Sequence, residues 1–112
     1  MRELPESDWK KLRLIREKAL ARFCTHVLGQ IHAKSAPEHF EEAHKTYLEV
    51  YKLVDENDGL RADLFDDWRR SMAFIRLMGW LSHGLVTEEE FHSLSQETQM
   101  VMSAIVNPKF YL

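Results

Sequence analysis

The segment SMAFIRLMGWLSHGL, from Ser71 to Leu85, decides the fold of this chain. Between Met72 and Leu81 its only charged residue is Arg76, and no proline interrupts it. At about 100° per residue, apolar side chains fall on two opposite sides of a helix. One side carries Leu64, Trp68, Met72, Ile75 and Gly79, and the other carries Phe74, Leu77 and Leu81, with Trp80 on the flank between them. Because both sides must be shielded from water, we expect this helix to be central in the protein or shared with a second chain.

The composition around this segment is that of a folded helical protein. The chain has 112 residues, of which 45% are hydrophobic and 29% charged, with only four Gly and three Pro. This length is enough for one core, and no run of alternating Val, Ile and Thr predicts a strand. We therefore expect an all-α protein with a single domain over residues 1–112.

Two features of the sequence bear on location. The first residues, MRELPESDW, lack the basic-then-apolar layout of a signal peptide, and the longest largely apolar run is about ten residues, too short to span a bilayer. The single cysteine, Cys24, cannot form an intramolecular disulfide, which favours a reducing compartment. The expectation is a cytoplasmic protein that does not enter a membrane.

Helix start and stop signals divide the chain into four segments. Pro37 opens the second helix, and the Asn-Asp-Gly turn at 57–59 is expected to end it. Gly84 should terminate the third helix, and Thr87 with Glu90 has the spacing of a capping box for the last one. The predicted helices are about 8–34, 37–56, 61–83 and 88–106. Amphipathic helices joined by short loops predict a four-helix, antiparallel, bundle-like domain.

The charge is unevenly distributed. Residues 1–34 contain eight Lys/Arg and four Asp/Glu, whereas residues 35–112 contain seven and fourteen. This division favours pairing between helices over binding to a phosphate backbone, which normally requires a basic surface. The charge distribution therefore disfavours nucleic-acid binding. Its candidate residues are Lys11, Lys18 and Arg22 on the first helix and Arg69, Arg70 and Arg76 on the third.

Metal and catalytic patterns are weak. Two Glu-x-x-His pairs, Glu41 with His44 and Glu89 with His92, have the spacing found in di-metal helical bundles. However, the apolar stripes of the predicted helices turn Glu41 and His92 away from the core. No Cys-x-x-Cys, phosphate loop or nucleophile motif occurs. We expect no metal, no cofactor and no catalytic residues, and therefore not an enzyme.

Large aromatic and Met side chains exceed what one small core needs, and such residues are typical of protein interfaces and of apolar ligand pockets. The sequence therefore favours a non-enzymatic protein that acts through association, as a homodimeric adaptor or inhibitor, with itself or another protein as partner. A small-molecule-binding helical bundle and a nucleic-acid-binding regulator are the alternatives. The candidate interface or ligand residues are Phe74, Arg76, Leu77, Trp80, Leu81 and Arg16.

Overall fold

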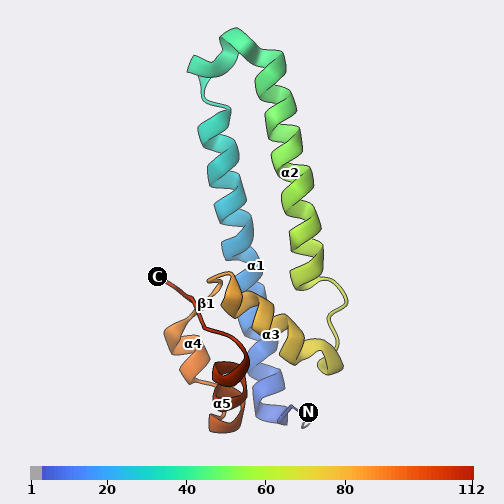
Figure 1. Ribbon diagram of the computed structural model, residues 1–112, viewed down its shortest axis with the longest axis vertical. Coiled ribbons are helices and arrows are strands. Elements are labelled where there is room, and N and C mark those ends of the chain that lie inside the picture. The colour runs from blue at the N-terminus through green and yellow to red at the C-terminus, as the bar shows by residue number, and fades with distance from the viewer. Residues whose placement is uncertain (1–3) are drawn as a thin grey trace.

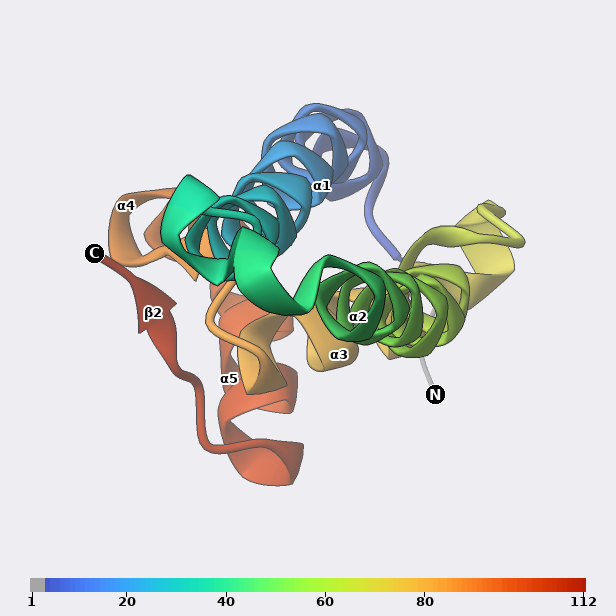
Figure 2. The same cartoon turned by 90° about the horizontal axis from the view of Figure 1, so that it is seen from above.

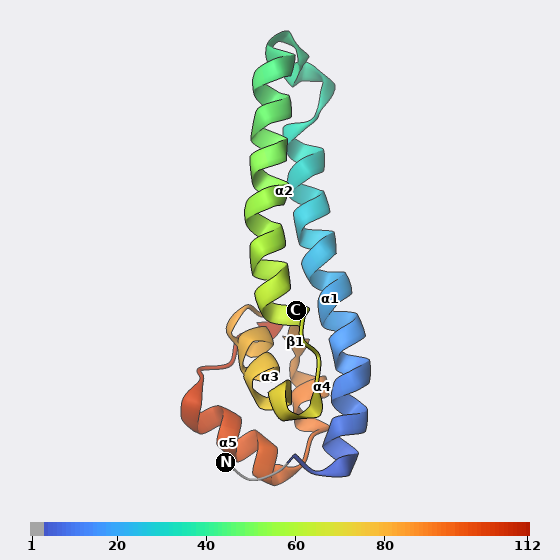
Figure 3. The ribbon, with the colours of Figure 1, turned by 90° about the vertical axis from the view of Figure 1, so that its right-hand side faces the viewer.

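The computed structural model describes residues 4–112 and shows a long helical hairpin that rises from a smaller helical base (Figure 1). The hairpin consists of α1 (Glu6–Lys34) and α2 (Ala43–Phe65), joined through the 3-10 helix η1 (Pro37–Glu42). The molecule measures 55 × 26 × 22 Å, and the hairpin accounts for its long axis (Figure 3). The all-α expectation is confirmed.

The base packs around the lower half of the hairpin. It contains η2 (Arg70–Met72), α3 (Ala73–Ser82), α4 (Glu88–His92) and α5 (Gln96–Ile105). Two short strands, β1 (Val86–Thr87) and β2 (Phe110–Tyr111), pair in parallel in the register Val86 to Phe110 and Thr87 to Tyr111. Seen along the hairpin, β2 lies at the edge of the base beside α4 (Figure 2). The described residues do not form the single bundle of four full-length helices that the sequence predicts.

The core lies where α3 crosses the lower end of the hairpin. Leu77, Trp80 and Leu81 have no solvent exposure. The indole of Trp80 stacks on Phe65 of α2 at 5.8 Å between ring centroids, and its Nε1 donates to the carbonyl of Leu64 at 2.9 Å. Both apolar sides of α3 are therefore covered within one chain. The helix is central in the protein and needs no second chain to cover it.

The second helix extends beyond its predicted end at residue 56. The turn signal at 57–59 lies inside α2, where Gly59 is exposed and a Cβ added to it would meet nothing within 4 Å. The Asn57 amide donates to the Leu53 carbonyl one turn back, at 2.8 Å, so it serves the helix rather than a turn. Burial of Leu64 and Phe65 further along outweighs the local preference for a stop.

The actual break comes at residues 66–69, inside the third helix predicted for 61–83. Asp67 has φ 54°, a left-handed conformation that Asp tolerates better than most residues. This reversal brings Trp68 between Trp9 of α1, at 5.1 Å between centroids, and Trp80, at 5.5 Å. Tertiary contacts of the Trp68 ring, invisible to a local pattern, thus accompany the break between α2 and α3.

The last predicted helix, 88–106, is divided into α4 and α5. Thr87 and Glu90 do form the capping box, which confirms that prediction. Ser95 then has extended backbone and caps α5, with its side chain accepting from the Thr98 N–H. The carboxylate of Asp8 accepts from the Ser95 N–H at 2.9 Å and from its hydroxyl at 2.6 Å, so α1 holds the new helix start in place.

No helix in the described part of the chain combines the length and the apolar character needed to cross a membrane.

Candidate functional site: an uncovered face on the helical arm

The upper part of the hairpin, residues 24–58, stands clear of the base, and we call it the arm. In Figures 1 and 3 only α1 and α2 lie beside each other along this part of the molecule. A pair of helices has no third element to close its interior, so side chains that face the partner helix, such as Val27, Ile31, Val50 and Leu53, are only half-buried. Helices in proteins depend on tertiary packing for most of their stability, and here half of that packing is absent.

Two rows of side chains follow α2, each with the alternating spacing of four and three residues that marks a helix–helix contact. The inner seam faces α1 and consists of Thr46, Val50, Leu53, Asn57, Leu60 and Leu64. The outer seam lies one residue further along and consists of Tyr47, Tyr51, Val54, Asp58, Arg61 and Phe65. A helix with two adjacent seams is built to contact two neighbouring helices, and α1 is one of them.

The base covers only the lower end of the outer seam. Phe65 is fully buried against Trp80 and meets Phe23 of α1 edge-on, with 6.1 Å between ring centroids. Further up, Tyr47 is 67% exposed, Tyr51 65% and Val54 44%. The seam that begins in the core therefore continues into solvent. The paired charges of Asp58 and Arg61, 2.7 Å apart, separate its buried end from the exposed Val54, Tyr51 and Tyr47.

The exposed part of the outer seam is large for so small a protein. Leu48, the next residue after Tyr47, is also half exposed, as is Phe40 in η1. With about 200 Å² for an aromatic side chain, this patch presents on the order of 500 Å² of surface. Patches of roughly 300–600 Å² are the largest on a typical monomer and often mark interaction sites.

The arm is acidic, whereas the rest of the chain is nearly neutral. Residues 24–58 contain three Lys and seven Asp/Glu, and the rest of the chain contains twelve Lys/Arg and eleven Asp/Glu. Lys45 with Glu42 and Lys52 with Glu56 form exposed pairs on the arm, 3.7 and 3.9 Å apart, which favour the helix by a few tenths of a kcal/mol each.

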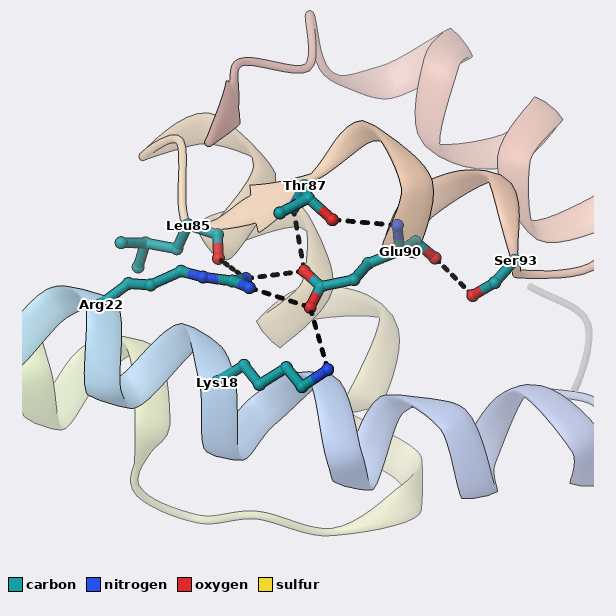
Figure 4. A network of polar contacts seen from close by, with 6 residues as sticks. All are labelled: Lys18, Arg22, Leu85, Thr87, Glu90 and Ser93. Atoms are coloured by element: carbon teal, nitrogen blue, oxygen red, sulfur yellow. Dashed lines mark hydrogen bonds and ion pairs between the residues drawn. The ribbon is translucent and has the colours of Figure 1, made fainter. Parts of the chain in front are cut away.

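A polar network fixes α4 and β1 to α1 just below the arm (Figure 4). Both terminal guanidinium nitrogens of Arg22 donate to the Glu90 carboxylate, at 2.6 and 3.0 Å, and Nη1 also donates to the Leu85 carbonyl at 2.9 Å. The same carboxylate accepts from the Thr87 N–H at 2.9 Å, and Lys18 lies 3.9 Å from it. Burial acts to raise the pKa of Glu90, but these hydrogen bonds outweigh it and hold that pKa below its ordinary value.

The predicted nucleic-acid face is therefore occupied by internal contacts. Arg22 and Lys18 are paired with Glu90, and Lys11 donates to the Ser93 carbonyl. Arg22 is half-buried in this contact, whereas Lys11 and Lys18 are exposed beside the base, and the surface beyond them is the acidic arm.

The predicted interface residues lie elsewhere than expected. Leu77, Trp80 and Leu81 have no solvent exposure and belong to the core of this chain, so they present no surface to a second chain. The physical reason is that the hairpin and the base together cover both sides of α3. Phe74 is half-buried and packs against this core, so the structure does not bring it together with the arm.

The two arginines also serve the fold. Arg16 donates from Nη2 to the Phe65 carbonyl at 2.7 Å, and its guanidinium lies 5.5 Å from the Trp68 ring centre. Arg76 donates from Nε to the Asp66 carbonyl at 3.0 Å. Both support the connection from α2 to α3, and neither lies on the arm.

The residues of the outer seam were missed because their helical spacing is also that of an ordinary buried stripe. The signal that could have found them is the width of that stripe. Adjacent residues alternate as apolar pairs over 47–54, namely Tyr47 with Leu48, Val50 with Tyr51, and Leu53 with Val54. Packing against a single neighbouring helix would bury only one residue of each such pair.

Two hollows lie near the arm. A crevice of about 350 Å³ at its foot is lined by Arg22, His26, His83 and Tyr111, among others. A second hollow of about 400 Å³ at the tip is lined mainly by charged residues, including Glu38, Glu41, Glu42 and Lys45. Within residues 4–112, no three His, Cys, Asp or Glu side chains lie together in a way that could hold a metal ion.

Comparison with protein families, with curated proteins and with solved structures finds no match for this chain.

Proposed function

We propose that this protein is a non-enzymatic, cytoplasmic association protein, an adaptor or inhibitor, and that the arm makes the contact with its partner chain. The observation that carries the proposal is the outer seam of α2, which is buried at Phe65 and exposed at Tyr47, Tyr51 and Val54. A partner helix laid along this seam would complete the packing that α3 provides at the lower end.

The chemistry of the seam supports such a partner. Tyr is enriched at interfaces because it buries a large apolar ring with few rotatable bonds and keeps a hydroxyl for a hydrogen bond. Amphipathic helices recognise grooves and other helices through anchors spaced three and four residues apart, the spacing of Tyr47, Tyr51 and Val54. A partner helix with an apolar stripe fits this arm if it meets the acidic positions with basic, neutral or hydroxyl-bearing side chains.

The test is the solution mass by light scattering across a dilution series, for the wild type and two variants. Tyr51→Glu places a charge in the seam, and Met100→Glu places the same charge at a similarly exposed site, 69% accessible, on α5. We expect a mass above that of the monomer for the wild type and for Met100→Glu, and a monomer for Tyr51→Glu.

If the wild type is a monomer, chemical cross-linking in an extract of the source cells tests for a foreign partner. A cross-linked protein lost in Tyr51→Glu and retained in Met100→Glu would be an arm-dependent partner. If neither self-association nor any cross-link depends on Tyr51, the proposal is refuted.

A second candidate function, binding of a small molecule, is favoured by the crevice at the foot of the arm. Its volume of about 350 Å³ is within the range of ligand pockets, and it combines the apolar Phe23 and Leu60 with His26, His83 and Tyr111. Thermal-shift screening with small aromatic and anionic compounds tests it. A shift that His26→Ala abolishes would support it, and the absence of any shift would argue against it.

A further inference from the structure

We infer that the partner on the outer seam is the same seam of a second copy of this chain, running antiparallel, with the two-fold axis beside Tyr51. This inference rests on the proposed function and names its partner. Two arms joined in this way would bring together four long helices, two from each copy.

The argument starts from the residues on either side of Tyr51. Three residues away on each side are Leu48 and Val54, four away are Tyr47 and Asp55, and seven away are His44 and Asp58. All seven are exposed on α2. At about 100° per residue they form one face, centred on Tyr51.

A two-fold interface requires that if one residue contacts another across the axis, the reverse contact also forms. With the axis at Tyr51, Leu48 lies opposite the partner's Val54, so apolar side chains meet. Tyr47 lies opposite the partner's Asp55, where a phenol hydroxyl can donate to a carboxylate. The face is therefore complementary to itself in this one orientation.

The charges on the face determine whether the two copies of α2 run parallel or antiparallel. The acidic residues of the face, Asp55 and Asp58, both lie toward the base, where Arg61 also pairs with Asp58 at 2.7 Å, and His44 lies toward the tip. In a parallel pair each Asp would lie opposite its own copy, and like charges in direct apposition disfavour association. In the antiparallel pair Asp58 lies opposite the partner's His44, and neither carboxylate meets another.

The contact area that this face offers is that of a weak dimer. Burial of this face with its polar side chains included, on the order of 500 Å² on each copy, gives a total near the lower end of specific interfaces, which is about 1,000–1,200 Å². We therefore expect a specific dimer that dissociates on dilution into the micromolar range, rather than an obligate one.

Cysteine cross-linking tests both the partner and the direction. The only native thiol, Cys24, is exposed and is first replaced in a Cys24→Ser background. A disulfide requires Cα atoms within about 7 Å. In the antiparallel pair Tyr51→Cys faces itself across the axis, whereas the two copies of Leu48→Cys are six residues, or about 9 Å, apart along the helices.

We expect Tyr51→Cys to form a disulfide dimer under mild oxidation, Leu48→Cys alone to form little, and Leu48→Cys mixed with Val54→Cys to form a mixed dimer. All three positions are exposed, so circular dichroism and melting temperature should stay close to those of the Cys24→Ser parent. Efficient cross-linking of Leu48→Cys to itself would show a parallel pair and overturn the antiparallel inference.

The failures of this inference and of the proposed function are distinguishable. A wild-type monomer without these disulfides, but with a Tyr51-dependent foreign partner, would overturn the self-pairing and leave the arm as the contact surface. A dimer whose mass Tyr51→Glu leaves unchanged would place the interface elsewhere and overturn both.

Discussion

Asp8 is the most completely buried charge in the described structure, and its replacement is the sharpest test of how the base is assembled. Its side chain has no solvent exposure. One carboxylate oxygen accepts from the Ser95 N–H at 2.9 Å, and the other accepts from the Ser95 and Thr98 hydroxyls, both at 2.6 Å. These bonds join the first turn of α1 to the first turn of α5.

The expected loss of stability follows from the hydrogen-bond donors that lose their acceptor when Asp8 is replaced. In Asp8→Ala the Ser95 N–H and the two hydroxyls lose a charged partner, and each buried donor left unpaired costs about 1–3 kcal/mol. The hydroxyls can rotate toward other acceptors, whereas the N–H cannot, so we expect a total loss of about 3 kcal/mol. Asp8→Asn keeps one acceptor oxygen and the shape of the side chain, and should cost about 1–2 kcal/mol. Losses of this size are a large fraction of a typical domain's stability.

The pH dependence provides an independent check. Burial acts to raise the pKa of Asp8, but the hydrogen bonds from Ser95 and Thr98 outweigh it, and the pKa lies below its ordinary value of 3.8. A carboxyl group with a lowered pKa in the folded state stabilises the protein above its unfolded-state pKa, and this stabilisation is lost as the pH falls through the lowered value. The stability gap between wild type and Asp8→Asn should therefore be constant at neutral pH and should narrow below about pH 4.

The assay is urea unfolding of wild type, Asp8→Asn and Asp8→Ala, followed by circular dichroism from pH 7 to pH 3. If Asp8→Asn were as stable as wild type at pH 7, or if the gap failed to narrow on acidification, the carboxylate would not be the group that holds α5.

Two further predictions concern the base and the hairpin. Glu90→Gln should lower the free energy of unfolding by about 2 kcal/mol because it removes the charged partner of half-buried Arg22. The control is Glu89→Gln at the exposed neighbouring residue, which should change the free energy of unfolding by less than about 0.5 kcal/mol. Urea unfolding at pH 7 compares the two, and equal effects would contradict the network. Gly79→Ala should destabilise the protein by about 1 kcal/mol because the new Cβ would lie 2.7 Å from the buried Leu64 side chain. Gly59→Ala should instead stabilise the protein by about 0.5–1 kcal/mol, because residue 59 is inside α2 and nothing lies within 4 Å of the new Cβ. Melting temperatures distinguish these opposite signs, and a loss of stability in Gly59→Ala would argue against a continuous α2.

Local chemistry was enough to place several elements. Thr87 and Glu90 satisfy each other's neighbouring N–H groups within one turn, so their capping box is determined by four consecutive residues. Gly84 takes the positive φ, 68°, that follows the end of α3, as a residue without a Cβ can. The two-sided apolar pattern around Trp80 likewise indicated a helix covered on both sides, because periodicity is a property of the sequence alone.

Other features depended on contacts between distant residues. Gly59 lies inside a helix because Leu64 and Phe65 beyond it are buried, and the break at Asp67 brings Trp68 against Trp9 and Trp80. The periodicity of α3 could not distinguish cover by the same chain from cover by a second chain. That depends on which helix crosses which, a matter of long-range packing.

The sequence by itself determined that the chain is helical, where two of its helices are capped, and that one helix must be shielded on both sides, because backbone hydrogen bonding and side-chain periodicity act over a few residues. Only the tertiary structure decided which apolar side chains are covered. The base buries α3 and the lower end of the outer seam, and it is too short to reach Tyr47, Tyr51 and Val54. The exposed surface on which the proposed function rests therefore arises from the difference in length between the hairpin and the base, which no local pattern in the sequence contains.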